Sequence, residues 1–176
     1  MIFTETPLSR AFVIDLERNE DERGFFARTW DQDVFEQEGL NPALMQCNIS
    51  FNKKIGTLRG MHFQAVPYQE VKLVRCTMGA IFDVIIDLHL DSPTFRHWFG
   101  LELSAENRRM LYIPEDFAHG FLTLKADTEV FYQMSARYLP ECACGVRWDD
   151  PAFGIVWPAG DKVISDRDQS FPNFRL

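Results

Sequence analysis

The stretch GTLRGMHFQAVPYQEVKLVRCTMGAIFDVIID, residues 56–87, decides the fold. It contains three runs with the apolar alternation of strands that bury one face, seen for example in Val71, Leu73 and Ile86. Polar residues able to do proton or hydrogen-bond chemistry lie among these strand residues, namely Arg59, His62, Gln64 and Lys72. The stretch therefore predicts a polar site built inside a β scaffold.

The rest of the chain favours the same fold class. Further strands are expected at residues 10–17, 25–30, 44–51, 97–103, 110–113, 120–124 and 128–135, with one helix at 31–39. Short turns separate about ten strands, a spacing typical of an antiparallel double sheet or barrel. No repeat or linker interrupts the 176 residues, so we expect a single domain over residues 1–176.

Composition restricts the classes of partner. A net charge of −8 and a pI near 5.0 argue against a nucleic-acid or anionic-membrane surface. The opening MIFTETPLSR does not resemble a signal peptide, and no apolar run approaches the ~20 residues of a membrane span. We interpret the four cysteines (Cys47, Cys76, Cys142 and Cys144) as reduced thiols of a cytoplasmic protein.

The strand at residues 44–51 carries two different faces. Gln46, Asn48 and Ser50 lie on one face, whereas Cys47 and Ile49 lie on the other. We interpret the polar face as a wall that contacts a ligand. The alternative is an exposed edge strand, which is common in antiparallel sheets.

A metal site is the first alternative for the central histidine. Metal-binding jelly rolls carry G-x5-H-x-H, and this chain has Gly56 and His62 but Gln64 in place of the second histidine. His119 falls where the last metal histidine would stand. Two histidines fall short of the usual three or four ligands, so we expect no metal.

The same residues suit acid–base chemistry. Histidine ordinarily titrates near pH ~6.5, which suits His62 as a general base. Such a base needs a carboxylate partner, and ISDRD at residues 164–168 offers two aspartates. Lys72 could stabilise an enolate oxygen, and Tyr132 or Tyr138 could donate a proton. The alternative for His62 is a core histidine with a structural partner.

Eleven motifs in order resemble the dTDP-4-dehydrorhamnose 3,5-epimerase family, the RmlC-type cupins. They are DERGFF (21–26), QCNIS (46–50), GTLRGMHFQ (56–64), KLVRC (72–76), GAIFDVIIDL (79–88), SPT (92–94), IPEDFAHGF (113–121), Tyr132, WDDP (148–151), WP (157–158) and ISDRD (164–168). The resemblance implies an all-β cupin jelly roll, an antiparallel double-stranded β-helix, that forms a homodimer without metal or other cofactor. It also implies a nucleoside-diphosphate 4-keto-6-deoxyhexose as substrate.

The resemblance also implies roles for individual residues. His62 matches the base, Asp168 its carboxylate partner, Lys72 the enolate-side cation and Tyr132 the opposite-face acid. Among the implied substrate contacts, Arg59 binds the diphosphate, and Gln46 and Asn48 bind the nucleoside. His119 and Tyr138 are further substrate contacts. Arg23, Phe26 and Arg28 lie in or beside a strand segment lent by the neighbouring subunit. We expect Arg59, His62 and Lys72 to lie on adjacent strands.

The chain departs from the family pattern at two positions. Arg28 stands where the family usually has a glutamate near the nucleotide base, and Asn52 replaces the second serine of N-x-S-x-S. An arginine can donate to cytosine acceptors, so one hypothesis is a CDP-linked substrate. The alternative is that Arg28 pairs with a carboxylate such as Asp31.

Three questions stay open at the level of sequence. Epimerases acting at C3, at C5 or at both carbons share these motifs. The nucleotide base and the pathway are also undetermined. A rival class is a non-catalytic or metal-dependent sugar-binding cupin, which metal analysis and deuterium exchange into a 4-keto nucleotide sugar would distinguish.

Overall fold

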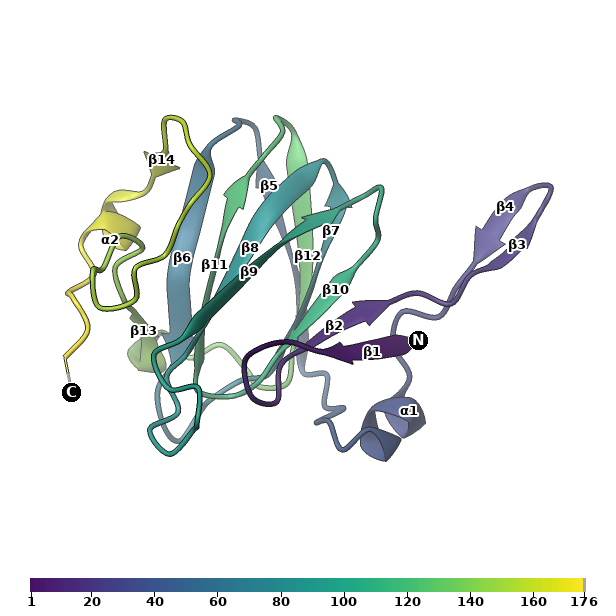
Figure 1. Cartoon of the computed structure of the whole chain (residues 1–176), viewed down its shortest axis with the longest axis horizontal. Coiled ribbons are helices and arrows are strands. Elements are labelled where there is room, and N and C mark those ends of the chain that lie inside the picture. The colour runs from purple at the N-terminus through teal and green to yellow at the C-terminus, as the bar shows by residue number, and fades with distance from the viewer. Residues whose placement is uncertain (176) are drawn as a thin grey trace.

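The computed structural model describes residues 1–175, in which two antiparallel sheets face each other (Figure 1). The first sheet has the order β1 (Ile2–Glu5), β2 (Phe12–Asp15), β10 (Met110–Ile113), β7 (Lys72–Met78), β12 (Thr128–Met134) and β5 (Gln46–Asn52). The second has the order β13 (Ala143–Gly145), β6 (Thr57–Gln64), β11 (Phe117–Thr123), β8 (Ala80–Asp87) and β9 (Trp98–Ser104). The predicted all-β jelly roll is confirmed, with β1 as a strand that the sequence analysis missed.

Apolar side chains from both sheets fill the space between them. Val74 and Leu111 of the first sheet join Ile81, Ile85 and Leu103 of the second in one buried cluster. These residues recur at alternate positions of their strands, as the pleat requires for an inner face. Burial of this apolar surface holds the two sheets together and leaves polar residues to line a separate part of the interior.

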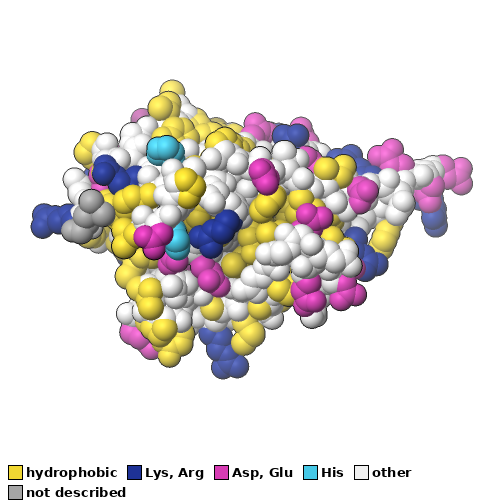
Figure 2. Space-filling model, turned by 60° about the horizontal axis from the view of Figure 1, so that its bottom comes forward, with side chains coloured by type: hydrophobic (Ala, Val, Ile, Leu, Met, Phe, Trp, Pro, Cys, Tyr) yellow, Lys and Arg dark blue, Asp and Glu magenta, His cyan; other side chains and the backbone are white. Residues whose placement is uncertain are grey.

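A two-stranded hairpin projects from this body. It consists of β3 (Asn19–Asp21) and β4 (Gly24–Phe26), which pair only with each other (Figure 1). The space-filling view shows the same arm carrying acidic and basic side chains (Figure 2). The predicted strand over residues 25–30 is wrong beyond Phe26, because the pairing of β4 with β3 ends there. Phe26 is 68% exposed at the end of the arm.

Two short helices flank the sheets. Asp31 caps α1 (Gln32–Gln37) by accepting from the backbone N–H groups of Asp33 and Val34, and Gly39 with φ of +71° ends it, as the prediction at 31–39 indicates. The sequence analysis missed α2 (Asp166–Gln169), whose first turn is capped by the Ser165 side chain. A 3₁₀ turn, η1 (Pro140–Cys142), leads into β13.

The C-terminal segment returns to the second sheet. Strand β14 (Val163–Ile164) pairs in parallel with β6 just before α2 begins. This pairing holds α2 beside β6, and so brings a helix near the end of the chain next to the central stretch. Over residues 1–175, none of the helices has the length and hydropathy to cross a membrane.

Candidate active site

The central histidine is paired with an aspartate from the end of the chain. Nε2 of His62 on β6 lies 2.8 Å from Oδ1 of Asp168 on α2, and the other carboxylate oxygen accepts the backbone N–H of Gly60 at 3.2 Å. Of the two aspartates that the sequence offered, Asp168 is buried, whereas Asp166 is exposed. The fold thus selects Asp168 as the partner of the histidine.

The charge of Asp168 determines which nitrogen of His62 is free. Burial raises the pKa of Asp168, but hydrogen bonds from His62 and the Gly60 N–H outweigh it, so this pKa lies below its ordinary value. An ionised carboxylate only accepts hydrogen bonds, so Nε2 of His62 carries the hydrogen. Nδ1 is then the nitrogen with a lone pair available to take a proton.

A bulge in β6 brings Arg59 and His62 to the same cavity. His62 pairs with His119 and Arg59 with Phe121, so three steps along β6 face two steps along β11. The bulge needs glycine on both strands. A Cβ on Gly60 would stand 2.5 Å from Cα of Gly120. The strand alternation would otherwise send Arg59 and His62 to opposite faces.

A second histidine–aspartate pair lies beside the first. Nε2 of His119 contacts Oδ1 of Asp83 at 2.8 Å, and His119 is directly opposite His62 across the β6–β11 pairing. His119 is buried and Asp83 is fully buried. His119 still lines the cavity, so one edge of its ring is available to a ligand.

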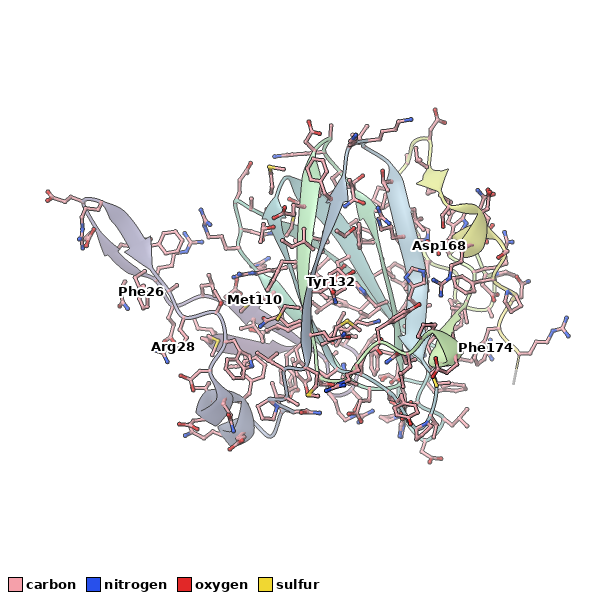
Figure 3. The ribbon with its side chains drawn as sticks, turned by 180° about the vertical axis from the view of Figure 1, so that it is seen from behind. Phe26, Arg28, Met110, Tyr132, Asp168 and Phe174 are labelled. Carbon is pink, nitrogen blue, oxygen red and sulfur yellow. The ribbon has the colours of Figure 1, made fainter. Side chains whose placement is uncertain are left out.

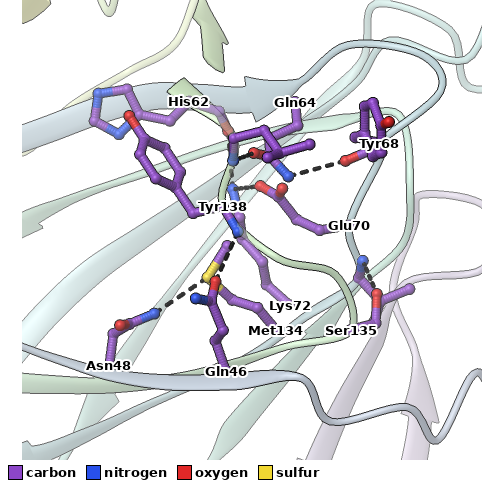
Figure 4. A network of polar contacts seen from close by, with 12 residues as sticks. Gln46, Asn48, His62, Gln64, Tyr68, Glu70, Lys72, Met134, Ser135 and Tyr138 are labelled. Carbon is purple, nitrogen blue, oxygen red and sulfur yellow. Dashed lines mark hydrogen bonds and ion pairs between the residues drawn. The ribbon is translucent and has the colours of Figure 1, made fainter. Parts of the chain in front are cut away.

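Lys72 faces this cavity from the other sheet. Its ammonium lies 3.0 Å from Oε1 of Glu70 and donates to the backbone carbonyl of His62 at 3.1 Å (Figure 4). The expectation of adjacent strands is wrong for Lys72. Strands β6 and β7 are consecutive along the chain but belong to different sheets, so Lys72 approaches from opposite the strand that carries Arg59 and His62.

Tyr132 also comes from the first sheet. It lies on β12 between Val74 of β7 and Asn48 of β5. Burial raises the pKa of the Tyr132 phenol, and the positive charge of Arg59 offsets part of this rise. Tyr132 is therefore protonated at neutral pH and can act as a donor.

These side chains line one cavity of about 480 Å³. Eight residues to which the family resemblance assigned a role are among its lining: Gln46, Asn48, Arg59, His62, Lys72, His119, Tyr132 and Tyr138. Sequence reasoning missed Glu70, Arg167 and the aromatic Phe63 and Phe121 in this lining. Glu70 was detectable in principle, because a carboxylate two positions from Lys72 on an extended strand points to the same face.

The polar face of β5 lines this cavity. Gln46, Asn48 and Ser50 belong to the lining, whereas Ile49 and Phe51 are exposed on the opposite face. Strand β5 is also the edge of its sheet, as the alternative interpretation had it. The edge position and the cavity wall are compatible because only alternate residues face inward.

Three predicted substrate contacts lie away from this cavity. Phe26 and Arg28 are remote from Tyr132 and Asp168 (Figure 3), and Arg23 belongs to the same projecting hairpin, where it pairs with Asp21. Arg28 contacts Asp31 at 2.6 Å and so forms the ion pair that the alternative to a base-reading role predicted. Within a single chain, these three residues do not contribute to the cavity.

Gln64 has a structural role at the position where metal-binding jelly rolls carry a histidine. Its amide nitrogen donates to the carbonyls of Tyr68 and Arg137, and its oxygen accepts the N–H of Leu139 (Figure 4). These contacts tie two loops to β6 at the cavity edge. The part of the chain that the structure describes has no cluster of three His, Cys, Asp or Glu side chains placed to hold a metal ion.

A double-sheet jelly roll with a polar cavity between the sheets defines the class of protein as a cupin. Comparison with known proteins identifies the family within this class. Residues 5–175 match the family model described as dTDP-4-dehydrorhamnose 3,5-epimerase. The chain belongs to this family, whose members are isomerases.

Individual relatives agree with this assignment. The dTDP-4-dehydrorhamnose 3,5-epimerase of Sinorhizobium fredii is 42% identical over 98% of this chain and 89% of its own length. The enzyme of that name from Bacillus anthracis, solved with TDP and PPi bound, has a TM-score of 0.94 at 39% identity, with coverage of 98% of this chain and 99% of its own. A Legionella pneumophila epimerase in complex with dTDP-4-keto-L-rhamnose has a TM-score of 0.91 at 35% identity, covering 98% and 92%.

Proposed function

We propose that this protein inverts C3 and C5 of a dTDP-linked 4-keto-6-deoxyhexose by proton transfer through an enolate. The observation that carries the proposal is the facing arrangement of the cavity. His62 with Asp168 lies on one side, and Lys72 and Tyr132 come from the opposing sheet. Family membership and the dTDP ligands of its structural relatives support the substrate class.

The ketone at C4 explains why two carbons react. Hydrogens on C3 and C5 are both alpha to this carbonyl, so loss of either proton gives an enolate with charge on the C4 oxygen. Nδ1 of His62 takes the proton, and Asp168 stabilises the imidazolium that forms. The Lys72 ammonium stabilises the enolate oxygen.

Inversion requires that the returning proton arrive on the other face of the sugar. The phenol of Tyr132 supplies it from the first sheet, while the base lies on the second. The phenolate then regains a proton and the imidazolium loses one, so the enzyme is restored for the next carbon. Substrate and product are isomers, so no electrons are transferred and no redox cofactor is consumed.

The charge of the cavity suits a diphosphate. Its described lining has three cationic side chains, Arg59, Lys72 and Arg167, and one carboxylate, Glu70, although the whole chain has a net charge of −8. A guanidinium can bind two phosphate oxygens at once, which favours Arg59 for this role. Gln46 and Asn48 of β5 would then contact the nucleoside, and His119 and Tyr138 the sugar.

The projecting hairpin supports a homodimer. Phe26 and Arg23 belong to the projecting hairpin and are not among the residues that line their own cavity. The exposed aromatic ring of Phe26 gains from burial against another surface. We propose that the hairpin completes the cavity of a second copy of the chain. Residues such as Ile49 and Phe51, exposed on the outer face of β5, offer apolar surface for the same contact.

Deuterium incorporation tests the proposed reaction. The protein is incubated with dTDP-4-dehydro-6-deoxyglucose in D₂O, and NMR counts deuterium at each carbon of the product. We expect deuterium at both C3 and C5 with inversion at each. Incorporation at one carbon would limit the enzyme to a single epimerisation, and no incorporation would contradict the proposal.

Subunit complementation tests the hairpin. Phe26→Asp and His62→Ala are each expected to inactivate a homodimer, the first through the lent hairpin and the second through the cavity. In a mixed dimer, one cavity has an intact His62 and receives an intact hairpin, so activity returns. Mixing that restores no activity after exchange of subunits would contradict the shared site.

A further inference from the structure

Asn52 is a buried polar residue at the edge of the site, and its side chain is fully engaged. It is 2% exposed at the end of β5. Its amide nitrogen donates to the backbone carbonyls of Ser50 and Thr128, both at 3.1 Å. Its oxygen accepts a hydrogen bond from Nε of Arg59 at 2.8 Å.

The contact with Arg59 crosses from one sheet to the other. Asn52 belongs to β5 of the first sheet and Arg59 to β6 of the second. Because two backbone carbonyls fix the amide of Asn52, its oxygen has one orientation and can hold Nε in one place. Arg59 itself is exposed toward the cavity, where a long side chain has many conformations, and the contact with Asn52 restricts them.

The contact at Nε leaves the two terminal nitrogens of the Arg59 guanidinium free to bind a ligand. The group has five N–H donors, and only the one on Nε is directed at Asn52. The two terminal nitrogens form the edge that binds two oxygens of a phosphate. Holding Nε therefore aims this edge without occupying it.

The partner of Arg59 is also uncharged, unlike the partner of Lys72. Glu70 places a carboxylate 3.0 Å from the Lys72 ammonium and offsets its charge. The Asn52 amide orients Arg59 and leaves its charge available to an anion. The same charge acts on the Tyr132 phenol, where it opposes the effect of burial on the pKa.

We propose that Asn52 is a positioning residue that fixes the Arg59 guanidinium so that its terminal nitrogens bind the diphosphate of the ligand. The chemical class of the ligand, a nucleoside diphosphate, rests on the proposed function. The positioning itself rests on the contact between Asn52 and Arg59. The asparagine side chain is long enough to join two backbone carbonyls and a guanidinium at once.

A double-mutant cycle on binding tests this role. The full-length variants Asn52→Ala, Arg59→Ala and the double variant are titrated by calorimetry with inorganic pyrophosphate and with dTDP. We expect Arg59→Ala to weaken binding about 100-fold. Asn52→Ala alone is expected to weaken it about 10-fold, with no further loss when Arg59 is already alanine.

The cycle separates positioning from general damage to the fold. An equal loss from Asn52→Ala in both backgrounds would show that Asn52 does not act through Arg59 and would overturn the proposal. If Asn52→Ala does not fold, Asn52→Ser takes its place in the cycle, since its hydroxyl can still donate to one of the two backbone carbonyls but lies on a shorter side chain than the amide that contacts Arg59. Asn52→Ser is expected to weaken pyrophosphate binding in the wild-type background only, and wild-type affinity would overturn the account.

The outcome is independent of whether the epimerase reaction occurs. Coupling of Asn52 and Arg59 on pyrophosphate, together with a wild-type protein that incorporates no deuterium into the 4-keto sugar, would refute the proposed function and keep the positioning role. Deuterium incorporation without coupling would support the proposed function and refute the positioning role of Asn52.

Discussion

Two histidine–aspartate pairs stand side by side in this protein and differ in their exposure. Each joins Nε2 of the histidine to Oδ1 of the aspartate at 2.8 Å, and the histidines face each other across β6 and β11. The side chain of His62 is 39% exposed, whereas that of His119 is 10% exposed. Asp83 comes from the middle of the same sheet, and Asp168 from a helix that docks onto it.

The difference separates two roles for the same chemical pair. A general base must reach its substrate and exchange its proton with solvent, which favours the accessible His62. His119 is held by a fully buried carboxylate inside the sheet, which favours a fixed contact with the ligand. We therefore propose that His62 alone acts as the base, although the two pairs share the same contact geometry.

The largest expected effect separates the two histidines by kinetics. His62→Asn should lower kcat by about 10³-fold, because it removes the general base, and should leave KM nearly unchanged. The matched variant His119→Asn should raise KM about 10-fold and change kcat by less than that, because it removes a ground-state contact. Steady-state assays of both variants check this, and a larger fall in kcat for His119→Asn would reverse the assignment.

The second effect concerns Tyr132, which approaches the cavity from the sheet opposite both histidines. Tyr132→Phe should slow formation of inverted product by about 100-fold, since general-acid catalysis is lost. Proton removal by His62 should continue, so substrate recovered from D₂O should contain deuterium without inversion. Equal slowing of exchange and inversion would show that Tyr132 is not the acid.

The third effect compares the two aspartates by stability. Asp83→Ala leaves the buried His119 without its partner and should cost about 3 kcal/mol of unfolding free energy. Asp168→Ala leaves His62 without its partner, but water can reach this partly exposed ring, so the loss of unfolding free energy should be about 1 kcal/mol. Urea denaturation followed by tryptophan fluorescence measures both costs. Similar costs would mean that the two pairs contribute equally to the stability of the fold.

The smallest effect is the acid sensitivity of the exposed pair. The folded-state pKa of Asp168 lies below its ordinary value, because hydrogen bonds from His62 and Gly60 outweigh burial. Its stabilisation is therefore complete above about pH 4 and is lost as pH falls through the folded-state pKa. The free energy of unfolding of Asp168→Asn should decline less than that of the wild type in this window. Parallel declines would contradict the lowered pKa.

Most of the fold could be predicted from the sequence because its signals are local. Short runs rich in apolar residues between turns identified the strands at residues 110–113 and 128–135, and an acidic start with Gly39 identified α1. The strand predicted over residues 25–30 was misjudged only beyond Phe26, because Trp30 has the strand propensity of an aromatic residue but packs against the core from a segment outside any strand.

The site was only partly predictable for a physical reason. The family resemblance assigned roles to eight residues that line the cavity, but it did not indicate the sheet to which each belongs. Lys72 lies opposite His62 only because strands far apart in the sequence pair into two facing sheets. Arg59 and His62 point into the same cavity only because of a bulge at Gly60. Short sequence windows do not encode either feature. The contact of Asn52 with Arg59 likewise appears only once β5 and β6 are placed in space.

The most direct test of the central claim, that His62 removes the substrate protons, is solvent exchange at each carbon by paired variants. His62→Asn and His119→Asn, both verified as folded, are incubated with dTDP-4-dehydro-6-deoxyglucose in D₂O, and NMR follows the C3 and C5 positions over time. We predict that His62→Asn exchanges neither position, whereas His119→Asn exchanges both under saturating substrate. Exchange at C3 or C5 by His62→Asn at the wild-type rate would contradict the account.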